Sequence, residues 1–331
     1  MTPRLPLGPV LAGIHGAALQ SDERDWLRHP AIGGVVLFAR NLVDSAQLRA
    51  LCASIHALRA PPLIIAIDQE GGRVQRCTLG IDSLPSAASL GALADTLGDL
   101  DAARAAVRAN AERLAADLLA LGVDLSFAPV LDLDHGRSAV IGDRALHRDP
   151  DRVAQLGAAW IDGMHAVGMP STGKHFPGHG WALADSHLAL PVDTRSLATL
   201  WNDDLRPYRA LAERGWPDLI MTAHVRYPGV DDLPASLSPV WINAVLRGAI
   251  GYDGLVIADD LGMEGAAVAG DCIARSHAAL AAGNDLIMLC NTPEQVPALL
   301  ETLPHAPAPA LSRRLDRLRA AGRLAGAVRA C

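Results

Sequence analysis

The feature that most constrains the fold of this chain is a series of short apolar segments that recurs along its whole length. Most of them contain no polar alternation, which is typical of parallel strands covered on both faces. We therefore predict a strand at each of these segments. They are Val10–Gly13, Val35–Phe38, Leu63–Ile67, Leu125–Ala128, Ser171–His175, Leu219–Thr222, Leu255–Ala258 and Asp285–Leu289.

Stretches of helical character separate the apolar segments. Eight strands alternating with helices predict an α/β fold, a single-domain (β/α)8 barrel of the TIM type. A doubly wound sheet has the same alternation, but no GxGxxG follows the first strand. The helices are expected at Ser45–Arg59, Leu100–Leu121, Asp151–Ala166, Leu197–Arg214, Pro239–Arg247 and Ala274–Ala282.

The end of the chain differs from the rest. No Gly/Ser/Pro-rich linker divides the chain, so we predict one barrel domain over residues 1–305. Residues 306–331 begin with a Pro/Ala segment and continue as an arginine-rich tail. Leu311, Leu315 and Leu318 follow helical spacing, which predicts a terminal helix packed on the barrel.

Composition narrows the class of protein. The net charge of −7 argues against a general nucleic-acid binder, which requires a basic surface. The chain has 5 cysteines and no CxxC, which suits a reducing compartment. No apolar run approaches the roughly 20 residues of a membrane span. Pro6, Gly8 and Pro9 interrupt the N-terminal apolar stretch, so we interpret it as a strand, not a signal peptide. We expect a cytoplasmic monomer without nucleic-acid or membrane partners.

Polar residues gather where the predicted strands end. In barrels of this type the active site lies at the C-terminal ends of the strands, so these residues are candidates for the site. Lys174 stands out because it is the single lysine among 29 lysine and arginine residues. The residues after the third to seventh strands are Asp68, Asp132, Lys174, His175, His224, Asp259 and Asp260.

Two segments contain most of these polar candidate residues. The segment 174–187 holds three histidines, Lys174 and Asp185, and its glycines and Pro177 predict a loop after His175. In the segment 256–264, a buried strand carries Asp259 directly to the rim, as a nucleophile requires. Asp260 points elsewhere by strand alternation, so we interpret it as a cap or a supporting group.

Several motifs together resemble the family 3 glycoside hydrolases, and more narrowly the single-domain bacterial β-N-acetylglucosaminidases of peptidoglycan recycling. The resemblance runs from about residue 8 to residue 300, with the motifs in the same order and with compatible spacing. It is carried by IDQEGGRVQR (67–76), IGDR (141–144), GKHFPGHG (173–180), DSH (185–187) and ADDLGMEG (258–265).

The resemblance implies roles for individual residues. Asp259 matches the catalytic nucleophile, His187 matches the general acid/base, and Asp185 matches the carboxylate paired with it. The implied activity is retaining, exo-acting hydrolysis of N-acetylglucosamine (GlcNAc) linked β-1,4 to anhydro-N-acetylmuramic acid in muropeptides. No metal or organic cofactor is implied. The residues that match those holding the terminal sugar are Asp68, Arg76, Arg144, Lys174 and His175.

A histidine acid/base is chemically reasonable without the resemblance. Retaining glycosidases usually place two carboxyl groups about 5–5.5 Å apart, one of them protonated. An imidazole with an ordinary pKa of roughly 6.5 can donate and accept a proton near neutrality. In Asp185-x-His187, the carboxylate can accept Nδ1–H and leave Nε2 for the glycosidic oxygen.

Four alternatives remain open. A metal-dependent barrel hydrolase would draw its ligands from His175, His179, His187, His224 and Asp259. A phosphorolytic variant would use phosphate in place of water, because a neutral acid/base does not repel an anionic acceptor. A Schiff-base lyase would use Lys174, and a sugar-binding barrel would have no catalytic activity.

Overall fold

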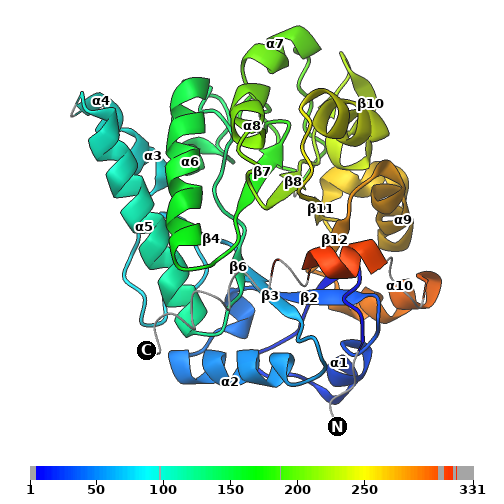
Figure 1. Cartoon of the computed structure of the whole chain (residues 1–331). Coiled ribbons are helices and arrows are strands. Elements are labelled where there is room, and N and C mark those ends of the chain that lie inside the picture. The colour runs from blue at the N-terminus through cyan, green and yellow to red at the C-terminus, as the bar shows by residue number, and fades with distance from the viewer. Residues whose placement is uncertain (1–4, 97, 187, 305–308, 316–317, 319–331) are drawn as a thin grey trace.

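The computed structural model describes residues 5–96, 98–186, 188–304, 309–315 and 318. Its centre is an eight-stranded parallel sheet with the order β6-β3-β2-β1-β12-β11-β8-β7 (Figure 1). Consecutive strands of this series are neighbours, as in a (β/α)8 barrel, so the predicted fold class is confirmed. The strands are β1 (Val10–Gly13), β2 (Ile32–Leu37), β3 (Ile64–Ile67), β6 (Leu125–Ser126), β7 (Thr172–Phe176), β8 (Leu219–Thr222), β11 (Leu255–Asp260) and β12 (Leu286–Leu289).

Backbone hydrogen bonds close the ring between the segment after β6 and β7. Thr172 N donates to Ala128 O, and Leu131 N donates to Lys174 O, both at 2.7 Å. β6 itself ends at Ser126, earlier than the predicted end at Ala128. Pro129 has no N–H to donate, which interrupts the ladder at this point.

Helices surround the barrel (Figure 1). The predicted helix 197–214 is two helices, α7 (Leu197–Asn202) and α8 (Leu205–Ala212). The break lies at Asp203, which is not helical and is four residues before Pro207. A proline ring clashes with the carbonyl four residues earlier, which explains the break.

The other predicted helices are present with shifted ends. The segment predicted at 239–247 is a π-helix over Val240–Ala249. The longer α-helices are α2 (Ser45–His56), α5 (Leu100–Ala120), α6 (Pro150–Ala166) and α9 (Cys272–Ala282). Shorter ones are α1 (Ser21–Trp26), α3 (Ala87–Gly91), α4 (Leu93–Thr96) and α10 (Val296–Thr302).

Two small hairpins lie outside the barrel sheet and were not predicted. They pair β4 (Gln69–Gly71) with β5 (Val74–Gln75), and β9 (Arg226–Tyr227) with β10 (Asp231–Pro234). The β4–β5 hairpin follows β3 directly, so it stands at the C-terminal end of the barrel. It carries Glu70 and ends one residue before Arg76.

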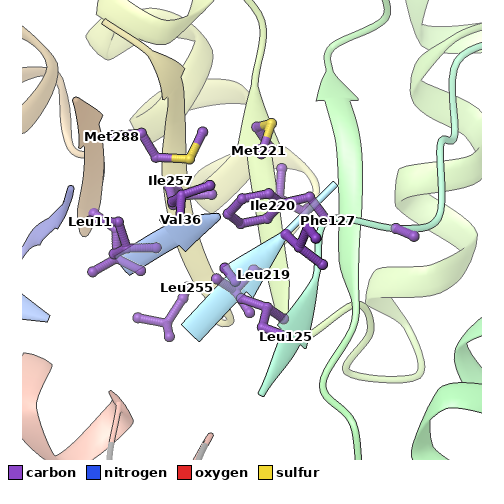
Figure 2. Packing of buried hydrophobic residues seen from close by; sticks show 14 of the residues in the cluster. Leu11, Val36, Leu125, Phe127, Leu219, Ile220, Met221, Leu255, Ile257 and Met288 are labelled. Atoms are coloured by element: carbon purple, nitrogen blue, oxygen red, sulfur yellow. The ribbon is translucent and has the colours of Figure 1, made fainter. Parts of the chain in front are cut away.

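Aliphatic side chains fill the inside of the barrel (Figure 2). Leu11, Val36 and Ile257 come from three different strands, and each is at most 1% exposed. Phe127 and Met288 pack in the same cluster and are also buried. The barrel interior is therefore a packed core, and the space for a ligand lies above it.

The C-terminal tail begins against the barrel. Residues 309–315 are helical, and Leu315 is fully buried. Ser312 Oγ donates to Leu7 O at 2.8 Å, and Arg314 pairs with Asp285 at 3.1 Å. Residues 305–308, 316–317 and 319–331, which include much of the predicted tail, lie outside the described residues. The domain boundary at residue 305 therefore stays a prediction.

Within the described ranges, no helix combines the length and the apolar character that a membrane crossing requires.

Candidate active site

A cavity of about 530 Å³ opens at the C-terminal ends of the barrel strands. Its wall contains every predicted site residue that lies within the described part of the chain. These are Asp68, Arg76, Arg144, Lys174, His175, Asp185 and Asp259. The eighth, His187, lies outside the described residues.

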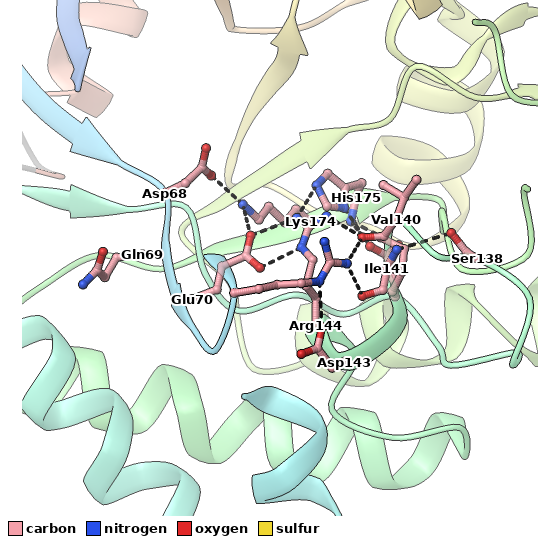
Figure 3. A network of polar contacts seen from close by, with 12 residues as sticks. Asp68, Gln69, Glu70, Ser138, Val140, Ile141, Asp143, Arg144, Lys174 and His175 are labelled. Atoms are coloured by element: carbon pink, nitrogen blue, oxygen red, sulfur yellow. Dashed lines mark hydrogen bonds and ion pairs between the residues drawn. The ribbon is translucent and has the colours of Figure 1, made fainter. Parts of the chain in front are cut away.

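Glu70 joins two of the predicted sugar-binding residues (Figure 3). Its carboxylate accepts two hydrogen bonds from the guanidinium of Arg144, from Nε at 2.8 Å and from Nη2 at 2.9 Å. The ammonium of Lys174 lies 2.7 Å from Glu70 Oε1 and 2.7 Å from Asp68 Oδ1. Lys174 is 2% exposed, so it is a buried cation held between two carboxylates.

This arrangement fixes the charges of both partners. Burial alone would raise the pKa of Glu70, but the charges of Lys174 and Arg144 outweigh it and hold that pKa well below its usual range. Burial would lower the pKa of Lys174, but Asp68 and Glu70 raise it overall. Glu70 is therefore a permanent anion and cannot serve as a general acid near neutral pH.

His175 is oriented by a buried carboxylate on the neighbouring strand segment. Its Nδ1 lies 2.6 Å from Asp132 Oδ2, and its backbone N–H also donates to Asp132 at 3.2 Å. An ionised carboxylate only accepts, so Nδ1 carries the hydrogen. The other nitrogen, Nε2, lies 3.5 Å from Arg144 Nη2 on the side of the cavity. Asp132 also accepts the N–H of His179 at 2.6 Å.

Asp259 lies at the end of β11, on the wall of the cavity. The backbone N–H of Asp260 donates to its Oδ1 at 2.8 Å. Burial would raise the pKa of Asp259, but its polar surroundings, which are His224, His175, this N–H and the ammonium of Lys174, hold the pKa below its ordinary value. A buried carboxylate is thus kept ionised at the floor of the site.

Asp260 has a structural task, as the sequence predicts. Its Oδ1 accepts the N–H groups of Gly262 at 3.1 Å and Cys290 at 3.0 Å. Its Oδ2 accepts from Asn291 Nδ2 at 2.7 Å. These bonds tie the end of β11 to the end of β12, so neighbouring carboxylates in the sequence have different surroundings.

The loop after β7 returns to the cavity at Asp185 and Ser186, both of which line it. Ser186 is 3% exposed, and two hydrogen bonds fix its position. Its Oγ lies 3.2 Å from His179 Nε2, and its carbonyl accepts the N–H of Gly265 at 2.9 Å. The loop is therefore attached to the segment that follows the strand of Asp259.

Comparison with known proteins identifies the family. Residues 10–320 match the model for the N-terminal domain of glycosyl hydrolase family 3. The chain belongs to glycosyl hydrolase family 3. It is 52% identical over 312 residues to a β-hexosaminidase of Alkalilimnicola ehrlichii, a match that covers 94% of this chain and 88% of that one. It is 51% identical to a β-hexosaminidase of Bordetella avium over 93% of this chain and 87% of that one.

Solved structures agree with the fold of this family 3 chain. NagZ from Neisseria gonorrhoeae in complex with N-trifluoroacetyl-D-glucosamine superposes with a TM-score of 0.90 at 44% identity. The match covers 97% of this chain and 94% of that one. NagZ from the same organism in complex with a zinc ion gives 0.89 at 41% identity. The protein is a glycoside hydrolase of the β-hexosaminidase type.

In the part of the chain that the structure describes, the histidines of the metal-dependent alternative form no metal-ligand group in this family 3 site. His224 is bonded through both ring nitrogens, to Ser236 and to Asp260 O. Among the described residues, the one group with ligand atoms within 4.8 Å of one another is His135, Asp203 and Asp204. It lies outside the cavity wall, and Arg195 already pairs with Asp204 at 2.7 Å.

Sequence reasoning missed two residues that shape the site. It did not include Glu70 among the candidate residues, although Glu70 binds both Arg144 and Lys174. It named Asp132 only as a rim residue and assigned it no role, although Asp132 orients His175. A buried carboxylate with a cation as its partner in space leaves no local signal in the sequence, because the residues involved are far apart along the chain.

Proposed function

We propose that this family 3 enzyme is a retaining exo-β-N-acetylglucosaminidase. It removes non-reducing terminal GlcNAc that is β-1,4-linked in peptidoglycan fragments, with GlcNAc-anhydro-N-acetylmuramic acid as the natural unit. The reaction takes place in the cytoplasm, in cell-wall recycling, and needs no metal or organic cofactor. The relatives named β-hexosaminidase and the NagZ complex with a GlcNAc analogue support the sugar specificity.

The surroundings of Asp259 carry the mechanistic part of the proposal. Of the other carboxylates in the cavity wall, Asp68 and Glu70 are neutralised by Lys174 and Arg144, and Asp260 is occupied by backbone N–H groups. Asp185 belongs to the loop after β7 and is assigned below to the acid/base. Within the described ranges, Asp259 takes part in no ion pair and accepts a hydrogen bond from Asp260 N alone. An ionised carboxylate on a rigid strand, with oxygen lone pairs open to the cavity, is suited to nucleophilic attack.

The reaction has two steps. In the first, a carboxylate oxygen of Asp259 attacks the anomeric carbon while the glycosidic C–O bond breaks. His187 gives its proton to the leaving oxygen, and Asp185 accepts the Nδ1–H of His187 and orients the ring. In the second step His187 takes a proton from water, and the water oxygen displaces Asp259. Two inversions retain the anomeric configuration.

The other charged residues of the cavity wall are proposed to bind the terminal sugar. Asp68, Lys174 and Arg144 offer charged acceptors and donors for hydroxyl groups. His175 lines the same cavity, and its Nε2 lies 3.5 Å from Arg144 Nη2. Arg76 lines the cavity with an exposed side chain. Because Lys174 and Arg144 are fixed by Glu70, their donors are in place before substrate arrives, which lowers the entropic cost of binding.

The proposal is tested with the disaccharide GlcNAc-anhydro-N-acetylmuramic acid and proton NMR. We expect the β anomer of GlcNAc to appear first and to mutarotate afterwards. First appearance of the α anomer, or no hydrolysis, contradicts the proposal. Parallel reactions with phosphate and with a chelator are expected to give GlcNAc at the same rate. Formation of GlcNAc 1-phosphate would instead establish the phosphorolytic alternative, and loss of activity on chelation the metal-dependent one.

A further inference from the structure

His224 is a buried histidine beside the site, and the proposed glycosidase reaction assigns it no role. It follows β8, the neighbour of β11 in the barrel, and it is fully buried. Its Nε2 lies 3.0 Å from the carbonyl oxygen of Asp260, and its Nδ1 lies 2.6 Å from Ser236 Oγ. The cavity wall does not include it, so it acts on the reaction only through other residues.

The partners of His224 fix its tautomer. A backbone carbonyl can only accept, so Nε2 carries a hydrogen and donates it to Asp260. Burial lowers the pKa of His224, so the ring is neutral and Nδ1 accepts the hydroxyl hydrogen of Ser236. Both ring nitrogens are thereby satisfied in one orientation, and rotation of the ring would break both bonds.

Further hydrogen bonds between buried polar groups fix the position of Ser236. Its backbone carbonyl accepts from Asn284 Nδ2 at 2.8 Å, and Asn284 Oδ1 accepts from Thr222 Oγ1 at 3.0 Å. Thr222 is the last residue of β8, opposite Ala258 of β11. This series of hydrogen bonds thus connects Asp260 on β11 to Thr222 on β8.

The end of β11 that this series of hydrogen bonds holds also carries Asp259. The carbonyl of Asp260 accepts a hydrogen bond from His224, and the N–H of Asp260 donates to Asp259 Oδ1 at 2.8 Å. On the other side, Gly265 packs so closely that a Cβ there would lie 2.8 Å from His224 Cβ. Since Gly265 N donates to Ser186 O, His224 lies between the strand of Asp259 and the loop of Asp185.

We infer that His224 is a positioning residue for the glycosidase reaction, which holds the Asp259 carboxylate in line with the anomeric carbon by bonding the Asp260 carbonyl. The inference rests on the proposed role of Asp259 as nucleophile. Attack by a misplaced carboxylate is slow even when all catalytic groups are present, because the rate depends steeply on the approach geometry.

The test measures glycosyl-enzyme formation with a dinitrophenyl N-acetyl-β-glucosaminide. Its leaving group needs no proton, so the rate reports the attack and not the acid. His224→Leu is expected to lower the rate of this step by about 100-fold with little change in KM. His224→Gln is expected to recover most of the loss, because its amide N–H can reach the Asp260 carbonyl.

His165→Leu is the matched control. His165 Nε2 bonds Asp218 Oδ2 at 2.6 Å, and Asp218 directly precedes β8 at the end of the barrel away from the cavity. This variant is expected to lose stability but to keep the wild-type rate per folded molecule. If His224→Leu fails to fold, Ser236→Ala replaces it, with a smaller loss expected in the same step.

Three results would overturn the inference: a wild-type rate in His224→Leu, an equal loss in His165→Leu, or no recovery in a folded His224→Gln. Each of these applies only if the wild-type enzyme forms its adduct on Asp259. If the adduct forms elsewhere, the proposed function itself has failed, and the two failures are thus distinguishable.

Discussion

Glu70 and Lys174 form an ion pair of 2.7 Å in which the two side chains are 4% and 2% exposed. Arg144 completes the group through two bonds to the same carboxylate. Breaking such a buried pair from one side leaves an uncompensated charge, which costs far more than the loss of a surface pair.

Glu70→Gln is therefore expected to lower the free energy of unfolding at pH 7 by about 3 kcal/mol. Urea unfolding measures this. Glu112→Gln removes a carboxylate 3.6 Å from Arg108 on the surface and is expected to change the free energy of unfolding by less than about 0.5 kcal/mol. Equal effects of the two substitutions would show that the buried group does not stabilise the fold.

The same group predicts a pH dependence. The pKa of Glu70 is lowered in the folded state, so its ionisation contributes stability above the unfolded pKa of roughly 4.3. That contribution is lost as the pH falls through the folded pKa. The difference in unfolding free energy between wild type and Glu70→Gln should thus shrink as the pH falls from about 5 to about 2. A difference that stays constant over this range contradicts the assignment.

Asp259 and Asp260 are expected to respond differently to the loss of their charge. Asp259→Asn is expected to abolish turnover and to lower the free energy of unfolding by at most about 1 kcal/mol, because the carboxylate accepts one N–H, that of Asp260, and has no ion-pair partner among the described residues. Asp260→Asn places an N–H₂ group among the donors of Gly262, Cys290 and Asn291, so it is expected to destabilise by about 1–3 kcal/mol. Activity assays and urea unfolding on both variants check this, and a stability loss confined to Asp259→Asn contradicts it.

Asp132→Asn tests how His175 is oriented. An amide can present N–H₂ to His175 Nδ1, which favours the tautomer with hydrogen on Nε2 and changes the face that His175 offers to the cavity. We expect a raised KM for an aryl N-acetylglucosaminide, with an additional loss of stability because His179 N also binds this carboxylate. An unchanged KM in a folded variant would remove His175 from the proposed sugar-binding set.

Ser186→Ala tests the attachment of the loop that carries Asp185. It removes the hydroxyl that meets His179 Nε2 but keeps the carbonyl that binds Gly265. If the loop supplies the acid, the rate should fall more for a poor leaving group, such as the natural disaccharide, than for dinitrophenolate. Ser54→Ala on α2, whose Oγ bonds Leu51 O, serves as the control. An equal loss on both substrates would mean that Ser186 does not act through the acid step.

The fold was largely predictable because the signals that define it are local. Each strand of the barrel overlaps a predicted segment, and most of these segments are apolar runs because the strands are buried on both faces. The break at Asp203 was also readable, since Pro207 cannot follow it in one continuous helix. The π-helix over Val240–Ala249 has no comparable signal, because its pattern of apolar residues is also that of an α-helix.

The sequence predicted which residues form the site better than it predicted the contacts between them. The strand ends gave Asp68, Lys174 and Asp259 as candidates, and the structure brings them to one cavity. That Lys174 meets Glu70 as well as Asp68, and that His224 reaches Asp260, depends on side-chain packing between strands. Such contacts are set by the closed barrel, so no spacing within one segment encodes them.

The proposed nucleophile is tested most directly by trapping the glycosyl-enzyme with a 5-fluoro N-acetylglucosaminyl donor, followed by intact-mass spectrometry and peptide mapping. The account predicts one added sugar per chain, carried by the peptide that contains Asp259 and absent in Asp259→Asn. A label on any other residue, or no label together with inversion of the anomer, would contradict it.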